Sequence, residues 1–392
     1  MRFTRRRLFH VLMIAVLSFP WWMRSAGAAP PDIIVLLADD LGATEIGPVQ
    51  RKPGIATPNI DALARNGITY TAAYAQPACV QARTALLAGK WPQRRSVGAV
   101  INNGPQPLPS MVTLAERLKA LGYATHLVGK WHLGFTGGRH PLDQGFDTFL
   151  GFQGITPDYV GDDPQAPLYR QRTRVHNTGN VTDTLGTEAV AILSGPRPRP
   201  RLLYVSWTAP HDPLQGTLSL RMAEMDRNIG RIVAAARPDS LIIFAGDNGR
   251  GNNAPLRGKK YDILEGGVRV PFILRWAGHA TPGRQVATPA SIVDIAVTAV
   301  KAAGGTFRDS DGFDLLNLPA ERGVFFKAFY GDPGLGIRRG PWKLYRNYMG
   351  QPLQLYNVTT DRHEDRNVAA ANPAVVNQLN ALLTGYANAL ND

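Results

Sequence analysis

The sequence contains only one cysteine, Cys79, so no disulfide can form within the chain. Without disulfides, the fold must be stabilised by a hydrophobic core. A chain of 392 residues with 44% hydrophobic content is long and apolar enough to bury a large core, which argues against a disordered protein. An isolated cysteine is either an inert buried thiol or a residue kept for its chemistry, and its surroundings must decide between them.

Long apolar runs are absent after the first residues. The one early run, from Val11 to Trp22, is interrupted by Pro20 and is short for a membrane span. Basic residues precede it and small residues follow it, which is typical of a signal peptide. We expect residues 1–28, with Arg5-Arg6-Arg7, to be a twin-arginine-type signal peptide. This predicts a periplasmic or secreted bacterial protein, the twin-arginine export machinery as a partner and no stable membrane insertion; an N-terminal anchor is the alternative.

Acidic residues are fewer than basic ones, 30 against 43, which gives a formal net charge of +13. Five arginines before Ala29 account for part of this excess. The other basic residues are scattered and form no stripe interleaved with aromatic residues, so we expect no nucleic-acid partner. The excess suits a small anionic substrate, although a generally basic surface explains it equally well.

Internal repeats are also absent, and the secondary-structure pattern alternates along the chain. Apolar β-branched runs predict strands at 32–37, 124–129, 202–206 and 240–245. Amphipathic spacing predicts helices at 58–66, 114–121 and 220–235. This alternation predicts an α/β fold in which a large, mostly parallel sheet is sandwiched by helices.

The pattern changes after about Gly304. Short strand-like segments precede a helix predicted at 373–390, so we expect a main domain over 30–304 and a smaller C-terminal α+β subdomain over 305–392. The polar, proline-rich segment 157–174 is expected to be a surface loop.

Polar residues directly follow two of the predicted strands. Asp39-Asp40 come after the first strand and Asp247-Asn248 after a later one. The carboxyl ends of parallel strands lie at one edge of the sheet, so these residues can meet in space. Carboxylate and amide oxygens suit calcium or magnesium. Two ordinary turns, in which Asp and Asn are common, are the alternative.

Other candidate site residues lie near the same predicted edge. Cys79 opens a helix-like segment whose backbone N–H groups favour an anion, and Arg83 lies one turn further on. Lys130 and His132 follow a predicted strand and point to the same side of an extended segment. His211, between two prolines, could act as an acid or a base. Each of these residues could instead belong to an ordinary loop.

Several motifs occur in a characteristic order. They are Thr57-Pro58-Asn59-Ile60-Asp61, the Cys79 segment, Gly129-Lys130-Trp131-His132-Leu133-Gly134, Ala209-Pro210-His211, Asp247-Asn248-Gly249, and Leu256-Arg257-Gly258 with Glu265-Gly266-Gly267. In this combination the chain resembles a type I sulfatase of the alkaline phosphatase superfamily. The resemblance covers nearly the whole chain after the signal peptide. It implies hydrolysis of sulfate esters of aryl or carbohydrate alcohols on an alkaline phosphatase-like fold.

The resemblance also implies roles for individual residues. A calcium ion, or alternatively magnesium, would be bound by Asp39, Asp40, Asp247 and Asn248. The formylglycine-generating enzyme would convert Cys79 to formylglycine, whose hydrated aldehyde is the nucleophile. Sulfate would be held by Lys130 and Lys260, and Arg83 would stabilise the ionised diol. His132 would act as base and His211 would protonate the leaving oxygen. Lys260, rather than Lys259, lies at the family's spacing from Glu265.

The cysteine segment departs from the family's C-x-P-x-R pattern. Gln81 replaces the proline, and Ala82 replaces the serine that commonly precedes the arginine. Two alternatives therefore stay open beside the sulfatase. One is a phosphodiester or phosphonate monoester hydrolase of the same superfamily, and the other is a non-catalytic anion-binding homologue in which Cys79 is not converted.

Overall fold

The computed structural model describes residues 29–46, 54–100, 106–154, 166–211, 217–251, 253–328 and 333–390. The predicted signal peptide lies outside these residues. Among the helices in the described part of the chain, none combines the length and apolar character that a membrane span requires.

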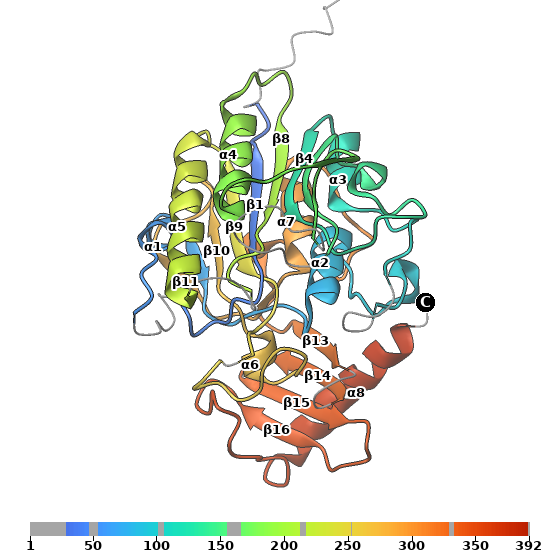
Figure 1. Ribbon diagram of the computed structural model, residues 1–392. Helices are drawn as coiled ribbons and strands as arrows, with labels where there is room; N and C mark the ends of the chain where they lie inside the picture. The colour runs from blue at the N-terminus through green and yellow to red at the C-terminus, as the bar shows by residue number, and fades with distance from the viewer. Residues whose placement is uncertain are drawn as a thin grey trace, which may run out of the picture.

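A ten-stranded sheet forms the centre of the protein (Figure 1). Its strand order is β11-β2-β10-β9-β1-β8-β4-β5-β6-β7. The strands are β1 (Ile33–Ala38), β2 (Ile68–Tyr70), β4 (Ala124–Lys130), β5 (Thr148–Phe152), β6 (Leu168–Arg170), β7 (Thr173–Val175), β8 (Arg201–Ser206), β9 (Leu241–Gly246), β10 (Phe272–Arg275) and β11 (Arg284–Val286). The central strands β9, β1, β8, β4 and β5 are parallel, while β10, β6 and β7 pair antiparallel with their neighbours.

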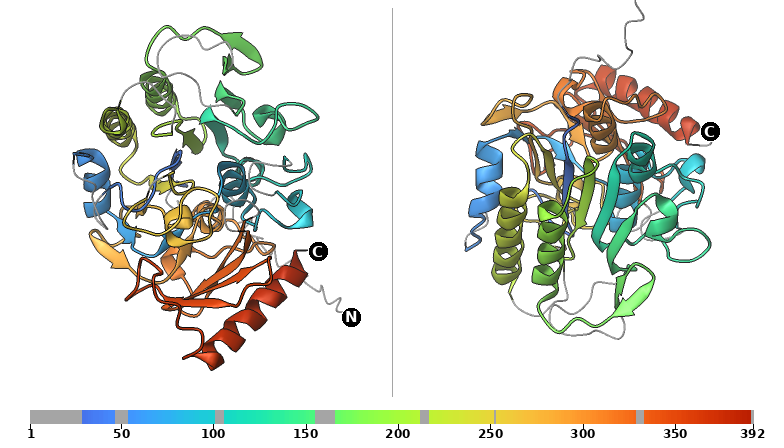
Figure 2. Two further views of the ribbon diagram at one scale, coloured as in Figure 1. Left: turned by 60° about the horizontal axis from the view of Figure 1, so that its bottom comes forward. Right: turned by 90° about the horizontal axis from the view of Figure 1, so that it is seen from above.

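Helices cover both faces of this sheet (Figure 2). Successive side chains of a strand point to opposite faces. Ile33, Val35 and Leu37 accordingly share a core with α2 (Cys79–Ala88), α3 (Leu114–Ala120) and α7 (Asp294–Ala302). Ile34 and Leu36 pack on the other side with α1 (Pro58–Arg65), α4 (Val181–Ser194) and α5 (Leu218–Ala235). The predicted α/β fold with a mostly parallel, helix-covered sheet is confirmed.

The prediction of a surface loop at 157–174 is wrong in its last part, and residues 157–165 lie outside the described part of the chain. The segment contains β6 and the start of β7, which form an antiparallel hairpin at the edge of the sheet. Both strands have only three residues, and β7 is largely exposed, so they are too short to show the apolar alternation by which a strand is recognised in a sequence.

The C-terminal part forms a second, smaller sheet below the main one in Figure 1. It consists of β13 (Gly323–Ala328), β14 (Gly334–Arg339), β15 (Trp342–Asn347) and β16 (Gln354–Asn357), all antiparallel, and α8 (Pro373–Ala389) packs on it. Its apolar core is continuous with Tyr74, Trp91 and Ile263 of the main unit. An α+β unit is present as expected, and its exact boundary stays a prediction.

A buried ion cluster joins the two units. Lys343 Nζ of β15 lies 3.0 Å from Glu265 Oε1 and 3.1 Å from Glu364 Oε1, and all three side chains are buried. Glu265 begins α6 (Glu265–Val268), directly after the loop that contains Lys260, and its backbone N–H donates to Glu364 Oε2 at 2.7 Å. Arg269 lies 3.0 Å from Glu265 Oε2. The cluster therefore fixes this loop against the C-terminal sheet.

The cluster generates a prediction about pH. Burial raises the pKa of Glu364 from 4.5 to about 7, an effect that Glu265 reinforces and Lys343 opposes. Because the folded state retains this proton when the unfolded chain has lost it, stability falls as pH rises from 4.5 towards 7, by up to about 1.4 kcal/mol per pH unit. Glu364→Gln should flatten the decrease in unfolding free energy over this range, measured by urea denaturation. An unchanged slope would contradict the assignment.

Candidate active site

The predicted site residues follow the carboxyl ends of neighbouring central strands. Asp39 and Asp40 come directly after β1, and Asp247 and Asn248 come directly after β9, which pairs with β1. Lys130 is the last residue of β4. The Cβ of any other residue at Gly129 would lie 2.0 Å from the carbonyl oxygen of Ser206, so glycine permits β4 and β8 to approach closely there.

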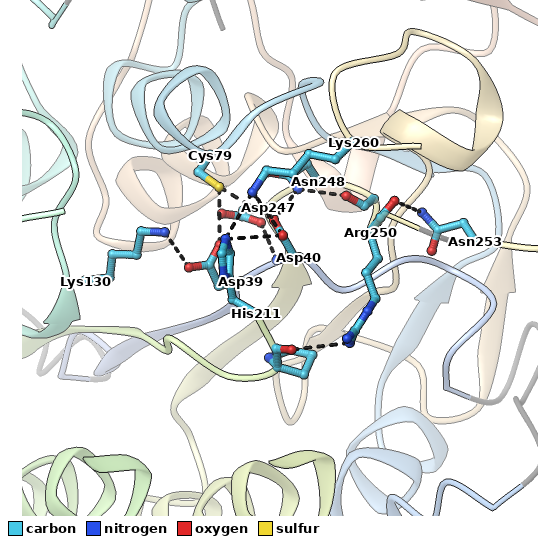
Figure 3. Close-up of polar contacts among 12 residues, drawn as sticks. Asp39, Asp40, Cys79, Lys130, His211, Asp247, Asn248, Arg250, Asn253 and Lys260 are labelled. Carbon is cyan, nitrogen blue, oxygen red and sulfur yellow. Dashed lines mark hydrogen bonds and ion pairs between the residues drawn. The ribbon is translucent and has the colours of Figure 1, made fainter. Parts of the chain in front are cut away.

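Three carboxylates and the cysteine gather at this edge. One ligand atom from each of Asp39, Asp40, Cys79 and Asp247 lies within 4.8 Å of the others, and all four residues are buried. The Cys79 thiol donates to Asp39 Oδ1 at 3.3 Å and to Asp40 Oδ1 at 3.6 Å. The backbone N–H of Asp40, with a φ of 57°, donates to Asp247 Oδ1 at 2.9 Å. Distant parts of the sequence thus form one compact anionic group (Figure 3).

Cations surround this group from several segments. Lys130 Nζ lies 2.6 Å from Asp39 Oδ2, and Lys260 Nζ lies 2.8 Å from Asp40 Oδ1, the two lysines approaching from different sides in Figure 3. Arg83 Nη2 lies 3.1 Å from Asp247 Oδ2 and 3.6 Å from Asp39 Oδ2. These ion pairs balance much of the carboxylate charge.

The electrostatic environment shifts the pKa values of Asp39 and Asp247 in opposite directions. Burial raises the pKa of Asp39, but Lys130 and Arg83 outweigh it and hold that pKa well below its usual value. Burial, reinforced by Asp39, raises the pKa of Asp247 to about 7. Two carboxylates this close cannot both ionise freely unless more positive charge is added. Burial, together with Asp247 and Asp39, also raises the pKa of the Cys79 thiol well above its usual value.

The two predicted histidines occupy different positions. His211 Nε2 lies 3.2 Å from Lys260 Nζ and 3.4 Å from Asp40 Oδ2, inside the network. Burial lowers the pKa of His211, opposed by Asp39 and Asp40. His132 makes no hydrogen bond or ion pair with the other predicted site residues among those described, and its Nδ1 is buried without a partner there. Burial, with Lys130 and Arg83, lowers the pKa of His132 well below its usual value.

The residue types and geometry fit a hard divalent cation. Oxygen ligands are offered by three carboxylates and by Asn248, whose Nδ2 donates to Asp40 Oδ1 at 2.6 Å. Asn248 Oδ1 is buried and has no hydrogen-bond partner among the described residues. A buried acceptor without a donor is costly, and a cation would satisfy it.

Sequence analysis missed residues that support the site. Arg83 Nη1 donates to the hydroxyl of Ser206. Ser206 is the last residue of β8, as Lys130 is of β4, so the position of Ser206 at a strand end could have identified it from the sequence. Arg250 Nη1 donates to the carbonyl of Pro210 at 3.3 Å, next to His211, and no local pattern indicated this contact. Of the two adjacent lysines, Lys260 lies 2.8 Å from Asp40 Oδ1, while Lys259 is exposed.

The comparisons with known proteins agree with one another. Residues 31–305 match the protein-family model for Sulfatase. N-acetylgalactosamine-6-sulfatase of Mus musculus is 29% identical over 91% of this chain and 80% of its own length, and arylsulfatase A of Homo sapiens is 29% identical over 91% and 88%. The solved structure of Ps i-CgsB in complex with k-i-k-neocarrahexaose is 28% identical, covers 91% of this chain and 92% of that chain, and has a TM-score of 0.84.

The buried arginine gives a prediction about stability. Arg83→Met leaves Asp39 and Asp247 without their shared counter-ion, so in the presence of EDTA it should lower the free energy of unfolding by about 3–5 kcal/mol. Arg227, whose exposed side chain pairs with Asp183 at 2.6 Å, provides a matched control, and Arg227→Met should cost less than about 1 kcal/mol. Urea denaturation measures both values. Equal losses would show that Arg83 does not compensate the buried acids.

Proposed function

Because the chain belongs to the sulfatase family, the type I sulfatases of the alkaline phosphatase superfamily, we propose that it hydrolyses sulfate esters with formylglycine from Cys79 as nucleophile and calcium as cofactor. The observation that carries this proposal is the position of the only cysteine. Its Sγ lies 3.3 Å from Asp39 Oδ1, beside an oxygen-ligand cluster that is surrounded by cations. A sulfate ester is an anion whose transferring group needs fixed positive charge on several oxygens.

The proposed metal site consists of Asp39, Asp40, Asp247 and Asn248. A calcium ion, or magnesium in its place, would supply positive charge that polarises a sulfate oxygen and stabilises an ionised nucleophile. The unpartnered Oδ1 of Asn248 and the raised pKa of Asp247 both indicate that the residues are arranged for additional positive charge.

The chain's own residues would bind and orient the substrate around Cys79. Conversion to formylglycine would supply a hydrated aldehyde with two hydroxyls. One would serve as nucleophile towards sulfur, with the alcohol as leaving group, and deprotonation of the other would release sulfate and regenerate the aldehyde. Lys130 and Lys260 extend from different segments towards the carboxylates, and both would bind sulfate oxygens. Arg83 Nη1 donates to the backbone carbonyl of Lys130 at 3.0 Å, and this bond would hold the positive charge of the guanidinium near the nucleophile. His211, in contact with Lys260, would protonate the leaving alcohol, and His132 would act as base.

The substrate class that we propose is a carbohydrate or aryl sulfate. The oligosaccharide complex of Ps i-CgsB supports the carbohydrate. The formylglycine-generating enzyme would act on the unfolded Cys79 segment. Twin-arginine export of an already folded chain to the periplasm is compatible with this order of events. Phosphonate monoesters and phosphodiesters, which have a similar tetrahedral anion, are the second candidate substrates.

The first test is the chemical state of Cys79 in protein from its native host. Mass spectrometry should show the aldehyde in place of the thiol. Aryl sulfate should be hydrolysed with a higher kcat/KM than an aryl phosphonate or a phosphodiester, and Cys79→Ala should abolish the activity. Gln81→Pro restores the family's pattern within the first turn of α2, where proline is tolerated, and should raise the converted fraction.

Two results would contradict this proposal. A higher kcat/KM for phosphorus esters would assign the site to the second candidate reaction. An intact thiol with no hydrolysis of any ester would favour a non-catalytic anion-binding protein.

The second test is metal removal. Chelation should abolish ester hydrolysis, and calcium at about 100 times its Kd should raise the unfolding free energy by about 2.7 kcal/mol. Asp247→Asn should weaken calcium binding measured by calorimetry. Asp239→Asn, which alters an exposed carboxylate paired with Arg237, is the matched control and should bind like the unmodified protein. Equal calcium affinity of the two variants would exclude Asp247 as a ligand.

A further inference from the structure

A cavity of about 440 Å³ opens next to His132, which is within the range of small-molecule sites. Three segments line it. His132, Phe135 and Arg139 follow β4, Gln153 follows β5, and Ala166 and Pro167 precede β6. His132 lines the cavity and lies two residues after Lys130, which pairs with Asp39 at 2.6 Å, so the cavity opens beside the carboxylate and lysine network. The cavity is therefore placed to receive whatever projects from the reacting sulfate.

One wall of the cavity is a fixed aromatic ring. Phe135 packs against His140, Tyr169 and Phe149, with ring centroids 4.4, 5.1 and 5.9 Å away. At Gly154, an added Cβ would lie 2.9 Å from Cδ2 of His132, so glycine allows this wall to approach the histidine closely. Together with Ala166 and Pro167, the ring provides an apolar surface for the carbon face of a bound alcohol.

Arg139 contributes a positive charge that has no acidic partner among the described residues. Its Nε donates to the carbonyl of Pro107 at 2.7 Å. Its side chain packs closely against Gly134, because an added Cβ at that position would lie 2.7 Å from Arg139 Cδ. Trp131 Nε1 donates to the carbonyls of Gly134 and Arg139 at 2.7 and 2.9 Å, which fixes the turn. Within the described part of the chain, neither Nη atom of Arg139 has a hydrogen bond or an ion pair.

We propose that this cavity binds the alcohol half of the substrate, and that Arg139 selects sulfate esters whose alcohol carries a second anionic group. The inference rests on the proposed function and narrows its substrate class to a polyanionic carbohydrate. The two free Nη groups form a planar donor pair that matches a carboxylate or a sulfate. Phe135 stacks on the sugar ring while Arg139 binds its second oxyanion.

The test compares four sulfate esters: 4-nitrophenyl sulfate, a neutral monosaccharide monosulfate, a monosaccharide disulfate and a monosulfated uronate. Arg139→Met should lower kcat/KM for the two dianionic sugars, the disulfate and the monosulfated uronate, by about 10- to 100-fold. It should change kcat/KM for 4-nitrophenyl sulfate and the neutral monosulfate by less than about twofold, because only the dianionic sugars lose a charged hydrogen bond. The disulfate and uronate arms distinguish a second sulfate from a carboxylate. Arg139→Lys, which keeps the charge without the planar pair, should give an intermediate loss.

Arg172→Met is the matched control. This arginine is exposed, pairs with Asp143 at 2.5 Å and does not line the cavity, so its removal should leave all four values unchanged. Equal losses on charged and neutral esters, or no loss on either, would overturn the role of Arg139 while leaving the sulfatase proposal intact.

Binding of the desulfated uronate separates this inference from the proposed function. Calorimetry should show weaker binding to Arg139→Met than to the unmodified protein, whether or not Cys79 has been converted. If no ester is hydrolysed but this difference is found, the hydrolytic function fails and the anionic subsite stands. If Arg139→Met does not fold, Arg139→Lys supplies the same comparison, and equal affinity of that variant and the unmodified protein for the uronate overturns the proposal.

Discussion

Like-charge repulsion among three buried carboxylates is the constraint on which the rest of the site depends. Asp39, Asp40 and Asp247 can lie together only because cations from three separate segments surround them. Lys130 ends β4, Arg83 projects from α2 and Lys260 comes from the loop before α6. The parallel sheet brings the acids to one edge, and the connecting segments bring the compensating charge. In the proposed enzyme the same cations and a metal ion stabilise the transferring sulfate.

The C-terminal unit contributes to this arrangement from outside the large sheet. Its Lys343 and Glu364 hold Glu265 in a buried ion cluster, and Glu265 directly follows the loop of Lys260. Removing one member of such a cluster leaves an uncompensated charge, so the position of the loop and the packing of the two units depend on each other. The small sheet therefore supports the site without contributing any of the ten predicted site residues.

The site combines a general part and a specific part. The carboxylates, Cys79 and the lysines address the sulfate group, which every sulfate ester shares. The cavity beyond His132, with Phe135 and Arg139, addresses the alcohol, which differs between substrates. Segments between strands build this second part, and such segments can vary without disturbing the core of the sheet. Gln81, where the cysteine segment departs from the family's pattern, has a buried side chain that donates to the carbonyl of Lys327 in β13.

The sequence by itself determined the central strands, the strand-end acids and the order of motifs, because buried parallel strands and turn residues leave local patterns. The resemblance to the family, through the spacing from Glu265, indicated Lys260 over Lys259. Tertiary structure alone decided that Arg83 reaches Ser206, that Glu364 meets Lys343 and that, within the described residues, the two Nη atoms of Arg139 have no partner. It also showed the short edge hairpin of β6 and β7. Such contacts join residues far apart in the chain, and whether a charge finds a partner depends on packing that no local pattern records.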